Sequence, residues 1–326
     1  MTVKSAMRNR VWVRPVWTIA IGAITFIVCL VLLEWVLRSR GYGNPPVYRY
    51  DAVAGYVLKP SQDLTRTSGC RVFINSLGMR AQETTKEKPG GMSRIVVFGD
   101  SVPYGGSYID QEDVFCSVAQ NQLNRSGDQK FEILNAGVNA WGPQNVFRYI
   151  QKVTAFHADM VVVYFPWVDL RRGLSNFHIV PFWENGPQFA VSEFFRHGVW
   201  AVFGMLSRRW KGSSAFHNVA DLEENLNALV GIKNYCDING IAVFFFWSPE
   251  RDVLLGAAPD SYATDRHKLY ERIPAHSIVD MTPVFSSEKE ASRLYVDSCH
   301  YSREGHLAAG NFLASFVRAH FEGVRR

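Results

Sequence analysis

Five short apolar runs constrain the fold of this chain more than any other feature of its sequence. Each is rich in β-branched and aromatic residues, and together they are RIVVFG at 94–99, FEILNAG at 131–137, MVVVYFP at 160–166, IAVFFFW at 241–247 and HSIVDM at 276–281. Short runs that are apolar at nearly every position are typical of strands buried on both faces, as in a parallel sheet.

Apolar residues with helical spacing separate these runs. The helical patterns cover 112–123, 143–157, 221–236 and 305–321. Regular alternation of strand and helix predicts an α/β domain, a three-layer α/β/α sandwich around a parallel sheet with right-handed crossovers. Ligands of such sheets bind at the carboxyl ends of the strands, so the residues that follow each strand are the candidates for a site.

Residues 17–37, WTIAIGAITFIVCLVLLEWVL, predict one N-terminal transmembrane helix. A stretch of about 20 apolar residues can cross a hydrocarbon core of roughly 30 Å. Its only ionisable residue, Glu34, lies near one end, and Trp17 and Trp35 lie where aromatic rings favour the membrane interface. A cleaved signal peptide is the alternative, but no small-residue cleavage pattern follows at 38–42, and an uncleaved anchor is favoured.

Charges on either side of this anchor predict its orientation. Four basic residues precede it, Lys4, Arg8, Arg10 and Arg14, whereas Arg38 and Arg40 follow it. The positive-inside bias predicts a single-pass membrane protein with a cytoplasmic N-terminus and an exported, periplasmic or otherwise extracytoplasmic domain. The four N-terminal residues also account for all but one unit of the formal net charge of +5, so no basic surface is left for a nucleic acid.

The chain divides into segments of different composition. We expect a cytoplasmic basic N-terminus at 1–16, the anchor at 17–37, a linker and lead-in at 38–92 rich in Gly, Pro and polar residues, and a catalytic domain at 93–326. An insertion at 171–218 is crowded with Phe and Trp. It is either a pair of amphipathic helices packed on the core or a lid or acceptor-binding wall beside the site, because aromatic faces suit both sugar rings and membrane interfaces.

The five cysteines indicate neither a metal site nor a particular disulfide pairing. Cys29 lies in the anchor, and Cys70, Cys116, Cys236 and Cys299 lie outside it without metal-ligand spacing. An exported domain could form disulfides among those four, but buried free thiols are an equally good interpretation. We expect no metal and no cofactor.

The end of the first predicted strand carries a candidate nucleophile. The sequence reads VFGDSVPYG at 97–105, so Ser101 directly follows a buried strand in a glycine-flanked turn. A helix that begins there would direct its N-terminal amides and the positive end of its dipole at an oxyanion. Gly-Asp-Ser is also an ordinary turn sequence, so Ser101 needs partners before it indicates catalysis.

LYVDSCHYSREGH at 294–306 supplies those partners. Asp297 and His300 are three residues apart in a tight turn before the last helix, where the carboxylate can fix the imidazole tautomer. The imidazole can then take a proton from serine, whose own pKa leaves it protonated. Either block alone is most simply a hydrogen-bonded turn, but the two together favour catalysis. The remaining histidines considered, His178, His197, His217 and His306, are interpreted as surface or packing residues.

These blocks together resemble the SGNH/GDSL hydrolase family. The resemblance rests on GDSVPYG at 99–105, NAGVNAWG at 135–142, an aspartate after the third strand and the Asp-x-x-His block, and it spans about residues 50–320. The lead-in, with INSLGMR followed by RIVVFGDS, resembles exported bacterial members associated with exopolysaccharide O-acetylation. The resemblance implies the SGNH hydrolase fold with a flavodoxin-like sheet, attack by Ser101, base catalysis by His300 and orientation of that base by Asp297.

The resemblance also implies an oxyanion hole, and here the sequence departs from the family. The family uses the serine amide, a glycine amide of the second block and an asparagine side chain of the third. The glycine falls at Ala140, whose amide can serve if its backbone conformation is allowed. The asparagine falls at Val168, which cannot donate, and loss of one donor typically costs on the order of 10²–10³ in rate.

The nucleophile and residues around the second block are therefore the candidates for the oxyanion hole. They are Ser101, Ala140, Gly137 and Asn139, and the side chain of Asn139, Gln144 or Asn145 could replace the missing asparagine.

The sequence thus predicts a serine esterase or O-acyltransferase that acts on acyl esters through an acyl-Ser101 intermediate. The acyl group expected is acetyl, and the substrate is an acylated carbohydrate or a small ester. Membrane contact is made by the N-terminal helix, and polysaccharide-assembly proteins are possible partners. The alternative hypothesis, motivated by Val168 and the aromatic insertion, is a catalytically weak SGNH domain that binds polysaccharide or a partner membrane protein.

Overall fold

The computed structural model describes residues 3–125, 129–175, 184–196, 219–285 and 288–324. The five apolar runs form one parallel sheet, composed of β5 Met92–Gly99, β6 Lys130–Gly137, β7 Met160–Pro166, β8 Ala242–Ser248 and β9 Ile278–Asp280. The spatial order is β6-β5-β7-β8-β9. Numbered along the chain, this is the flavodoxin-like order 2-1-3-4-5. The predicted parallel α/β sheet is confirmed.

Helices cover both faces of this sheet. The α-helices of the domain are α2 Ser101–Tyr104, α3 Phe115–Asn124, α4 Pro143–Val153, α6 Val219–Ile238, α7 Arg251–Leu254, α8 Ser261–Arg272, α9 Thr282–Phe285, α10 Glu288–Leu294 and α11 Arg303–Val324. Single 3₁₀ turns lie at η1 Thr67–Gly69, η2 Gln111–Asp113, η3 Thr154–His157, η4 Trp167–Arg171 and η6 Ala275–Ser277.

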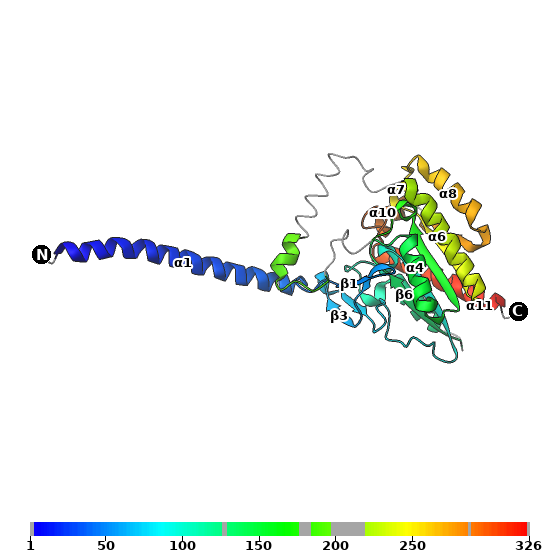
Figure 1. Ribbon diagram of the computed structural model, residues 1–326, viewed down its shortest axis with the longest axis horizontal. Coiled ribbons are helices and arrows are strands. Elements are labelled where there is room, and N and C mark those ends of the chain that lie inside the picture. The colour runs from blue at the N-terminus through cyan, green and yellow to red at the C-terminus, as the bar shows by residue number, and fades with distance from the viewer. Residues whose placement is uncertain (1–2, 126–128, 176–183, 197–218, 286–287, 325–326) are drawn as a thin grey trace.

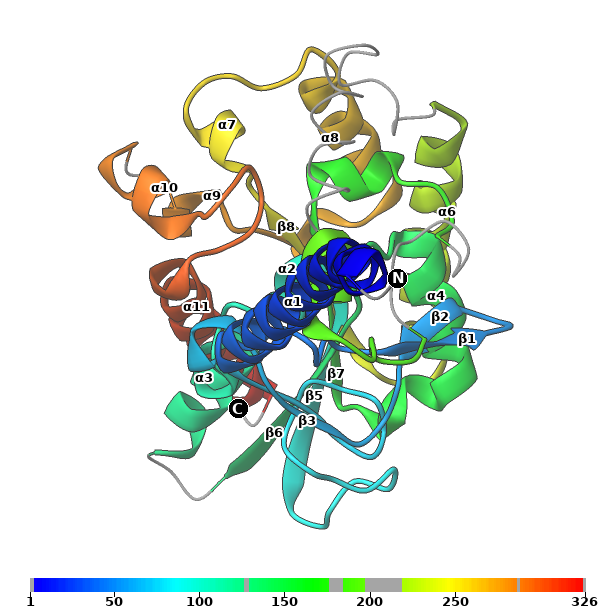
Figure 2. The ribbon, with the colours of Figure 1, turned by 90° about the vertical axis from the view of Figure 1, so that its left-hand side faces the viewer.

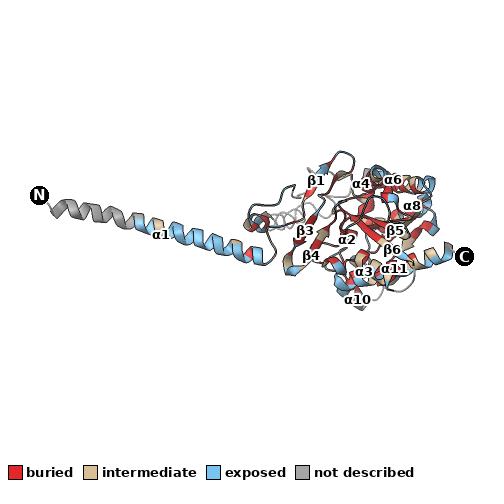
Figure 3. Ribbon diagram, turned by 90° about the horizontal axis from the view of Figure 1, so that it is seen from below, coloured by how far each residue is buried: buried red, intermediate tan, exposed pale blue. Residues whose placement is uncertain are grey.

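The alternation of side chains along β5 shows why three layers form. Ile95 and Val97 join a buried apolar cluster with α3 and α11, whereas Val96 and Phe98 join a second cluster with α4 and α6. Successive residues of a strand point to opposite faces, so a strand that is apolar at every position needs a helical layer on each side. Figure 3 shows the buried strands between the more exposed helices.

The lead-in packs on the domain as short extended pieces. It forms two antiparallel hairpins, β1 Tyr48–Asp51 with β2 Gly55–Leu58 and β3 Gln62–Thr65 with β4 Arg71–Ile74. Inward-facing residues of these hairpins are buried in the same cluster as Val96 and Phe98. Burial of apolar surface of this kind holds the lead-in against the sheet.

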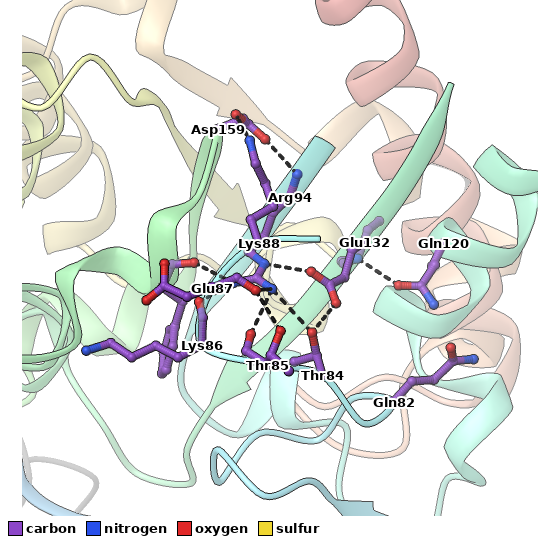
Figure 4. A network of polar contacts seen from close by, with 12 residues as sticks. Gln82, Thr84, Thr85, Lys86, Glu87, Lys88, Arg94, Gln120, Glu132 and Asp159 are labelled. Carbon is purple, nitrogen blue, oxygen red and sulfur yellow. Dashed lines mark hydrogen bonds and ion pairs between the residues drawn. The ribbon is translucent and has the colours of Figure 1, made fainter. Parts of the chain in front are cut away.

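A buried arginine fastens the end of the lead-in to the amino-terminal edge of the sheet (Figure 4). Arg94, which is fully buried near the start of β5, donates to Glu132 at 2.6 Å and to the carbonyl oxygens of Lys86 and Phe156. Asp159 accepts the Arg94 amide at 2.8 Å and pairs with Lys88 at 2.5 Å. A buried guanidinium is tolerated because its donors meet acceptors in this way. This network lies at the opposite end of β5 from Ser101.

Helix α1 (Val3–Ser39) projects from the domain as a rod (Figure 1). Its segment Trp17–Ser39 is long and apolar enough to cross a membrane, by length and composition. The helix ends in a Schellman motif, in which the Tyr42 amide donates to Leu37 O and the Gly41 amide to Arg38 O. Gly41 has φ +83°, the left-handed conformation that this motif needs.

Candidate active site

Ser101 lies at the end of β5 in a turn that only a narrow set of residues permits. A side chain on Gly99, which has φ +158°, would meet the carbonyl oxygen of Tyr164 at 2.2 Å. Asp100 is buried, and its carboxylate accepts the Val102 amide at 2.8 Å as the N-cap of α2. Ser101 is therefore the first residue of a capped helical turn, and its hydroxyl lies at the carboxyl end of the sheet.

Two buried side chains form hydrogen bonds to the backbone around Ser101, in the turn that follows β5, which we call the nucleophile turn. Arg80 donates to the carbonyl oxygens of Tyr104 at 2.9 Å and Ile109 at 2.6 Å. Asn135 donates to Pro103 O at 2.6 Å and accepts the Gly137 amide at 3.0 Å. Arg80 ends the INSLGMR motif and Asn135 begins NAGVNAWG, so both motifs that carry the resemblance act on the backbone around Ser101. Sequence reasoning gave neither residue a role.

Asp297 and His300 lie in a turn whose ends meet, which we call the base turn (295–301). Tyr295 and Tyr301 form an antiparallel bridge, and the Val296 amide donates to His300 O at 2.9 Å. Inside the turn, Asp297 Oδ1 accepts the His300 amide at 2.8 Å. The Asp-x-x-His spacing thus fixes the carboxylate against the backbone of the histidine that it serves.

Aromatic hydroxyls fasten the base turn to the sheet. The Tyr301 hydroxyl forms one hydrogen bond with the Tyr164 hydroxyl at 2.7 Å and one with Ser248 Oγ at 2.5 Å. These partners lie toward the carboxyl ends of β7 and β8. Tyr295 donates to Pro249 O at 2.6 Å. Because these hydroxyls are buried and paired, they place the base turn at a defined height above the strands.

The structure brings Ser101, His300 and Asp297 into one hydrogen-bonded chain. Ser101 Oγ lies 2.7 Å from His300 Nε2, and His300 Nδ1 lies 2.7 Å from Asp297 Oδ2. This is the spacing at which imidazole can accept the serine proton while the carboxylate holds its other nitrogen. Ser101 and His300 are 199 positions apart in the sequence, so only folding brings them together.

The electrostatics of this chain favour an ionised carboxylate. Burial of Asp297 raises its pKa, but hydrogen bonds from the His300 ring and amide outweigh burial and lower the pKa to about 2. Burial of His300 opposes protonation, yet the carboxylate of Asp297, with the sulfur of Cys299, raises the pKa of the imidazole above its ordinary value. The unprotonated base is therefore populated increasingly as the pH rises.

Cys299 lies next to the His300 ring. Its sulfur is 3.7 Å from His300 Nδ1, and burial raises the pKa of the thiol. All five cysteines of the chain are free thiols in this structure. Asp297, Cys299 and His300 also place one ligand atom each within 4.8 Å of one another, a grouping that could hold a metal ion. A metal there would compete with the hydrogen bond between His300 and Asp297.

The opposite side of the site consists of residues 138–145 and 166–172, which we call the oxyanion edge. Ala140 takes the left-handed conformation with φ +61°, which a non-glycine residue adopts at a cost of about 1–2 kcal/mol. Its backbone therefore has the conformation that glycine would favour. The amide of Gly137 donates to Asn135, and the side-chain amide of Asn139 donates to the Tyr48 hydroxyl at 2.8 Å, so both donors are engaged within the fold.

The other candidate side-chain donors differ from one another. Asn145 donates to Ala54 O at 2.9 Å and to Ser175 O at 2.8 Å, so it holds the lead-in and the chain after η4. Gln144, at the start of α4, has a buried side-chain nitrogen that meets no acceptor among the described residues. Val168 is partly buried against the core, and its amide donates to Glu250 at 3.0 Å.

An ion pair at the oxyanion edge, between the buried Asp169 and the partly exposed Arg172, was not anticipated from the sequence. Arg172 Nε donates to Asp169 Oδ1 at 2.8 Å, and 30% of the arginine side chain remains exposed. Burial opposes the charge on Arg172, but the carboxylates of Asp169 and Asp100 outweigh it and raise the arginine pKa. A cation thus lies near the carboxylate that caps the nucleophile turn. Its spacing from Asp169, three residues along a 3₁₀ turn, was the available signal.

His306 and the aromatic insertion are the remaining parts of the chain for which an expectation was drawn from the sequence. His306 is a buried packing residue that stacks on Phe115 and accepts its amide at 3.3 Å. Of the aromatic insertion at 171–218, residues 176–183 and 197–218 lie outside the described part, and His178, His197 and His217 lie there with them.

No family model matches the chain, and no curated protein matches it. Among solved structures, it is similar to a lipase/acylhydrolase from Enterococcus faecalis, with 15% identity over 70% of this chain and 97% of that one and a TM-score of 0.46. It is also similar to the acetyl xylan esterase AlAXEase, with 13% identity, 69% and 99% coverage and a TM-score of 0.46.

A third similar structure is a two-domain esterase active on acetylated mannans, with 14% identity over 70% of this chain and 49% of that one and a TM-score of 0.42. Similarity this low leaves the activity to be argued from the site itself.

Proposed function

We propose that this chain is a serine hydrolase of the SGNH/GDSL type that cleaves or transfers acyl esters. The observation that carries the proposal is the hydrogen-bonded chain from Ser101 through His300 to Asp297, with both links at 2.7 Å. A structural turn would not require an imidazole to bridge a strand-end serine and a carboxylate. Nucleophilic acyl transfer does require that arrangement.

The chemistry follows from the positions of the atoms. Ser101 Oγ attacks the ester carbonyl carbon while His300 Nε2 takes the hydroxyl proton, and the carbonyl oxygen becomes an oxyanion. The imidazolium then gives its proton to the leaving alkoxide as the tetrahedral centre collapses to acyl-Ser101. Water, deprotonated by His300, then attacks the acyl carbon, and the imidazolium returns the proton to Ser101 Oγ as the acid is released. A sugar hydroxyl in place of water completes a transfer.

Stabilisation of the oxyanion falls to the amides of Ser101 and Ala140, with Gln144 as the side-chain donor. Ser101 begins α2, so its amide lies at a helix start, and the φ of Ala140 is the one expected of a glycine at that position. Of the three side chains that could replace the missing asparagine, Gln144 is the one whose nitrogen has no acceptor among the described residues. An unsatisfied buried donor at an active site is a natural partner for developing charge.

We propose an acetylated glycan as substrate and an exported location for the domain. The glycan follows from the resemblance of the lead-in to proteins associated with exopolysaccharide O-acetylation. The topology follows from the charges, because four basic residues precede the apolar segment while Arg38, one of the two that follow, is paired with Glu34 at 2.7 Å. Reporter fusions placed after Arg40 should be active only outside the cytoplasm, and cytoplasmic activity would overturn this topology.

A fluorophosphonate probe tests the activity directly. The full-length protein in detergent should be labelled at Ser101, because the probe reacts only with an activated serine, and Ser101→Ala should abolish the labelling. Ser107→Ala, which changes a partly buried serine six residues away, is the matched control and should be labelled as the native chain is. A folded native chain that stays unlabelled would favour the alternative that Val168 and the aromatic insertion motivated, an SGNH domain retained for binding, which the engagement of Asn139 and Asn145 within the fold also supports.

A further inference from the structure

A short helix of the insertion lies beside the domain end of α1, where it is unlabelled in Figure 1. The chain is helical from residue 190 to 196, the last described residue before a gap. Three phenylalanines of this segment face solvent, with exposed fractions of 60% for Phe189, 46% for Phe194 and 60% for Phe195. We call residues 189–196 the aromatic helix. So much exposed aromatic surface in one place indicates a binding surface.

Glu34 of α1 binds the first turn of the aromatic helix. Its carboxylate accepts the amides of Ala190 at 2.9 Å and Val191 at 3.0 Å. Arg38, one turn further along α1, pairs with Glu34 and also donates to Gln188 O at 2.9 Å. The only ionisable residue of the apolar segment 17–37 is therefore a side chain that caps another helix, which explains how it is accommodated there.

A second carboxylate joins the aromatic helix to the start of the lead-in. Glu193 is fully buried and accepts both the Gly43 amide and Arg66 Nη2 at 2.5 Å. Arg66 also donates to Gly41 O at 2.8 Å, and Tyr42 packs edge-on against Phe194. Because Glu193 and Arg66 are buried and bonded to each other, the aromatic helix, the end of α1 and the lead-in form one connected unit rather than segments joined by a flexible tether.

The contact with Glu34 sets the depth of the aromatic helix in a membrane. Trp17–Ser39 has 23 residues, about 34 Å of helix, against a hydrocarbon core of roughly 30 Å. Glu34 lies five residues before Ser39, so it lies near the boundary of that core, about 7 Å along the axis from the end of the helix. Its neighbour Trp35 is 68% exposed, at the level where indole rings favour the interface.

We propose that the aromatic helix is a second membrane contact, with Phe189, Phe194 and Phe195 inserted at the lipid interface beside α1. Interfacial segments hold their aromatic side chains in the boundary between headgroups and acyl chains, which is the depth that Glu34 gives this one. The lead-in after α1 contacts residues that follow β5 and β6. Cys70 donates to Tyr108 O, which follows β5, and the Tyr48 hydroxyl accepts a hydrogen bond from Asn139, which follows β6. Membrane contact here fixes the orientation of the domain, with the side on which α2 is seen toward the anchor (Figure 2).

Photo-crosslinking to lipid tests this proposal without depending on ester hydrolysis. The full-length protein is reconstituted in vesicles of phosphatidylcholine and phosphatidylglycerol that contain a phosphatidylcholine with a diazirine near the top of an acyl chain. After irradiation, mass spectrometry of the digested protein should find lipid adducts on the aromatic helix as well as on α1. Adducts confined to α1 would overturn the proposal.

Variants show whether the phenyl rings and the Glu34 contact are responsible. Phe189→Ser with Phe195→Ser should lower adducts on 189–196 several-fold and leave those on α1 unchanged, and each single change should give part of the loss. Glu34→Leu, which removes both acceptors, should also lower them. The matched control is Ile238→Ser, which changes an 85% exposed residue at the end of α6, far from α1 (Figure 1). Equal adducts in the native chain and the double variant, with equal thermal unfolding, would contradict a contact made by these rings.

Discussion

The base turn and the oxyanion edge lie on opposite sides of Ser101 and are built in different ways. In the base turn, His300 and Asp297 are bonded to each other and to Ser101, and the turn is half exposed. At the oxyanion edge, Asn139 and Asn145 bind the lead-in, and Val168 replaces a donor. The proposed proton-transfer groups are hydrogen-bonded to one another, whereas most polar side chains on the other side serve the fold. For the proposed hydrolase, we expect from this difference that substitutions at the two sides of Ser101 affect the rate to different extents.

Removal of the proton-transfer groups should have the largest effect. Ser101→Ala and His300→Ala should each lower turnover of a small acetyl ester by on the order of 10⁴-fold or more, because the residues act as a unit. The double variant should be no worse than either single one, and turnover of 4-nitrophenyl acetate by the full-length protein measures all three. Full activity in Ser101→Ala would rule out the mechanism.

Asp297→Asn should cost less than His300→Ala, about 10³–10⁴-fold, because the amide still contacts the ring but cannot stabilise its charged form. The carboxylate raises the pKa of His300, and the base must be unprotonated, so activity of the native chain should rise with pH through and above neutrality. Without the carboxylate, the pKa falls and the rising limb should move to lower pH. A pH–rate profile of both chains checks the shift, and an unmoved limb would mean that His300 is not the group being titrated.

The oxyanion edge should respond by smaller factors of about 10². Gln144→Met, which keeps the length of the side chain and removes the donor, should lower kcat by that order if Gln144 supplies the third hydrogen bond. Val168→Asn should then add little, with Val168→Leu as the control for packing. If Gln144→Met leaves kcat unchanged while Val168→Asn raises it, the native oxyanion hole has only backbone donors. The base turn and the oxyanion edge would then differ even more than the structure indicates.

Ala140→Gly should have the smallest effect, and on stability rather than rate. The left-handed φ of Ala140 strains a residue with a Cβ, so glycine should raise the free energy of unfolding by about 0.5–1 kcal/mol after its greater unfolded-state entropy is deducted. Chemical denaturation measures the change. Ala136→Gly, in the buried interior of β6, should destabilise instead. A loss of stability in Ala140→Gly would mean that the methyl group of Ala140 contributes packing that outweighs its strain.

Much of the architecture could be predicted from the sequence because the responsible forces are local. Short runs rich in apolar, β-branched and aromatic residues are typical of strands buried in a parallel sheet, and the runs that form β5, β6, β7, β8 and β9 were all predicted. The polar sequence of α8, SYATDRHKLYER, has too few apolar residues for a clear helical pattern, and this helix was missed. The Gly-Asp-Ser and Asp-x-x-His blocks were recognisable because each is a turn with its own internal hydrogen bonds.

Only the tertiary structure decided how those blocks are used. Ser101 and His300 meet because Tyr301 binds Tyr164 and Ser248 on two other strands, a contact that no local pattern specifies. The sequence contains three amide side chains that could replace the asparagine missing at Val168, those of Asn139, Gln144 and Asn145. Each can bind an oxyanion only if carbonyl or hydroxyl groups from distant parts of the chain do not already accept its hydrogen bonds. Glu34 likewise appeared as a charge in an apolar helix until the fold supplied the amides of Ala190 and Val191. Hydrogen-bond donors and acceptors far apart in sequence find one another only in the folded chain, so their pairing, unlike their presence, had to be observed.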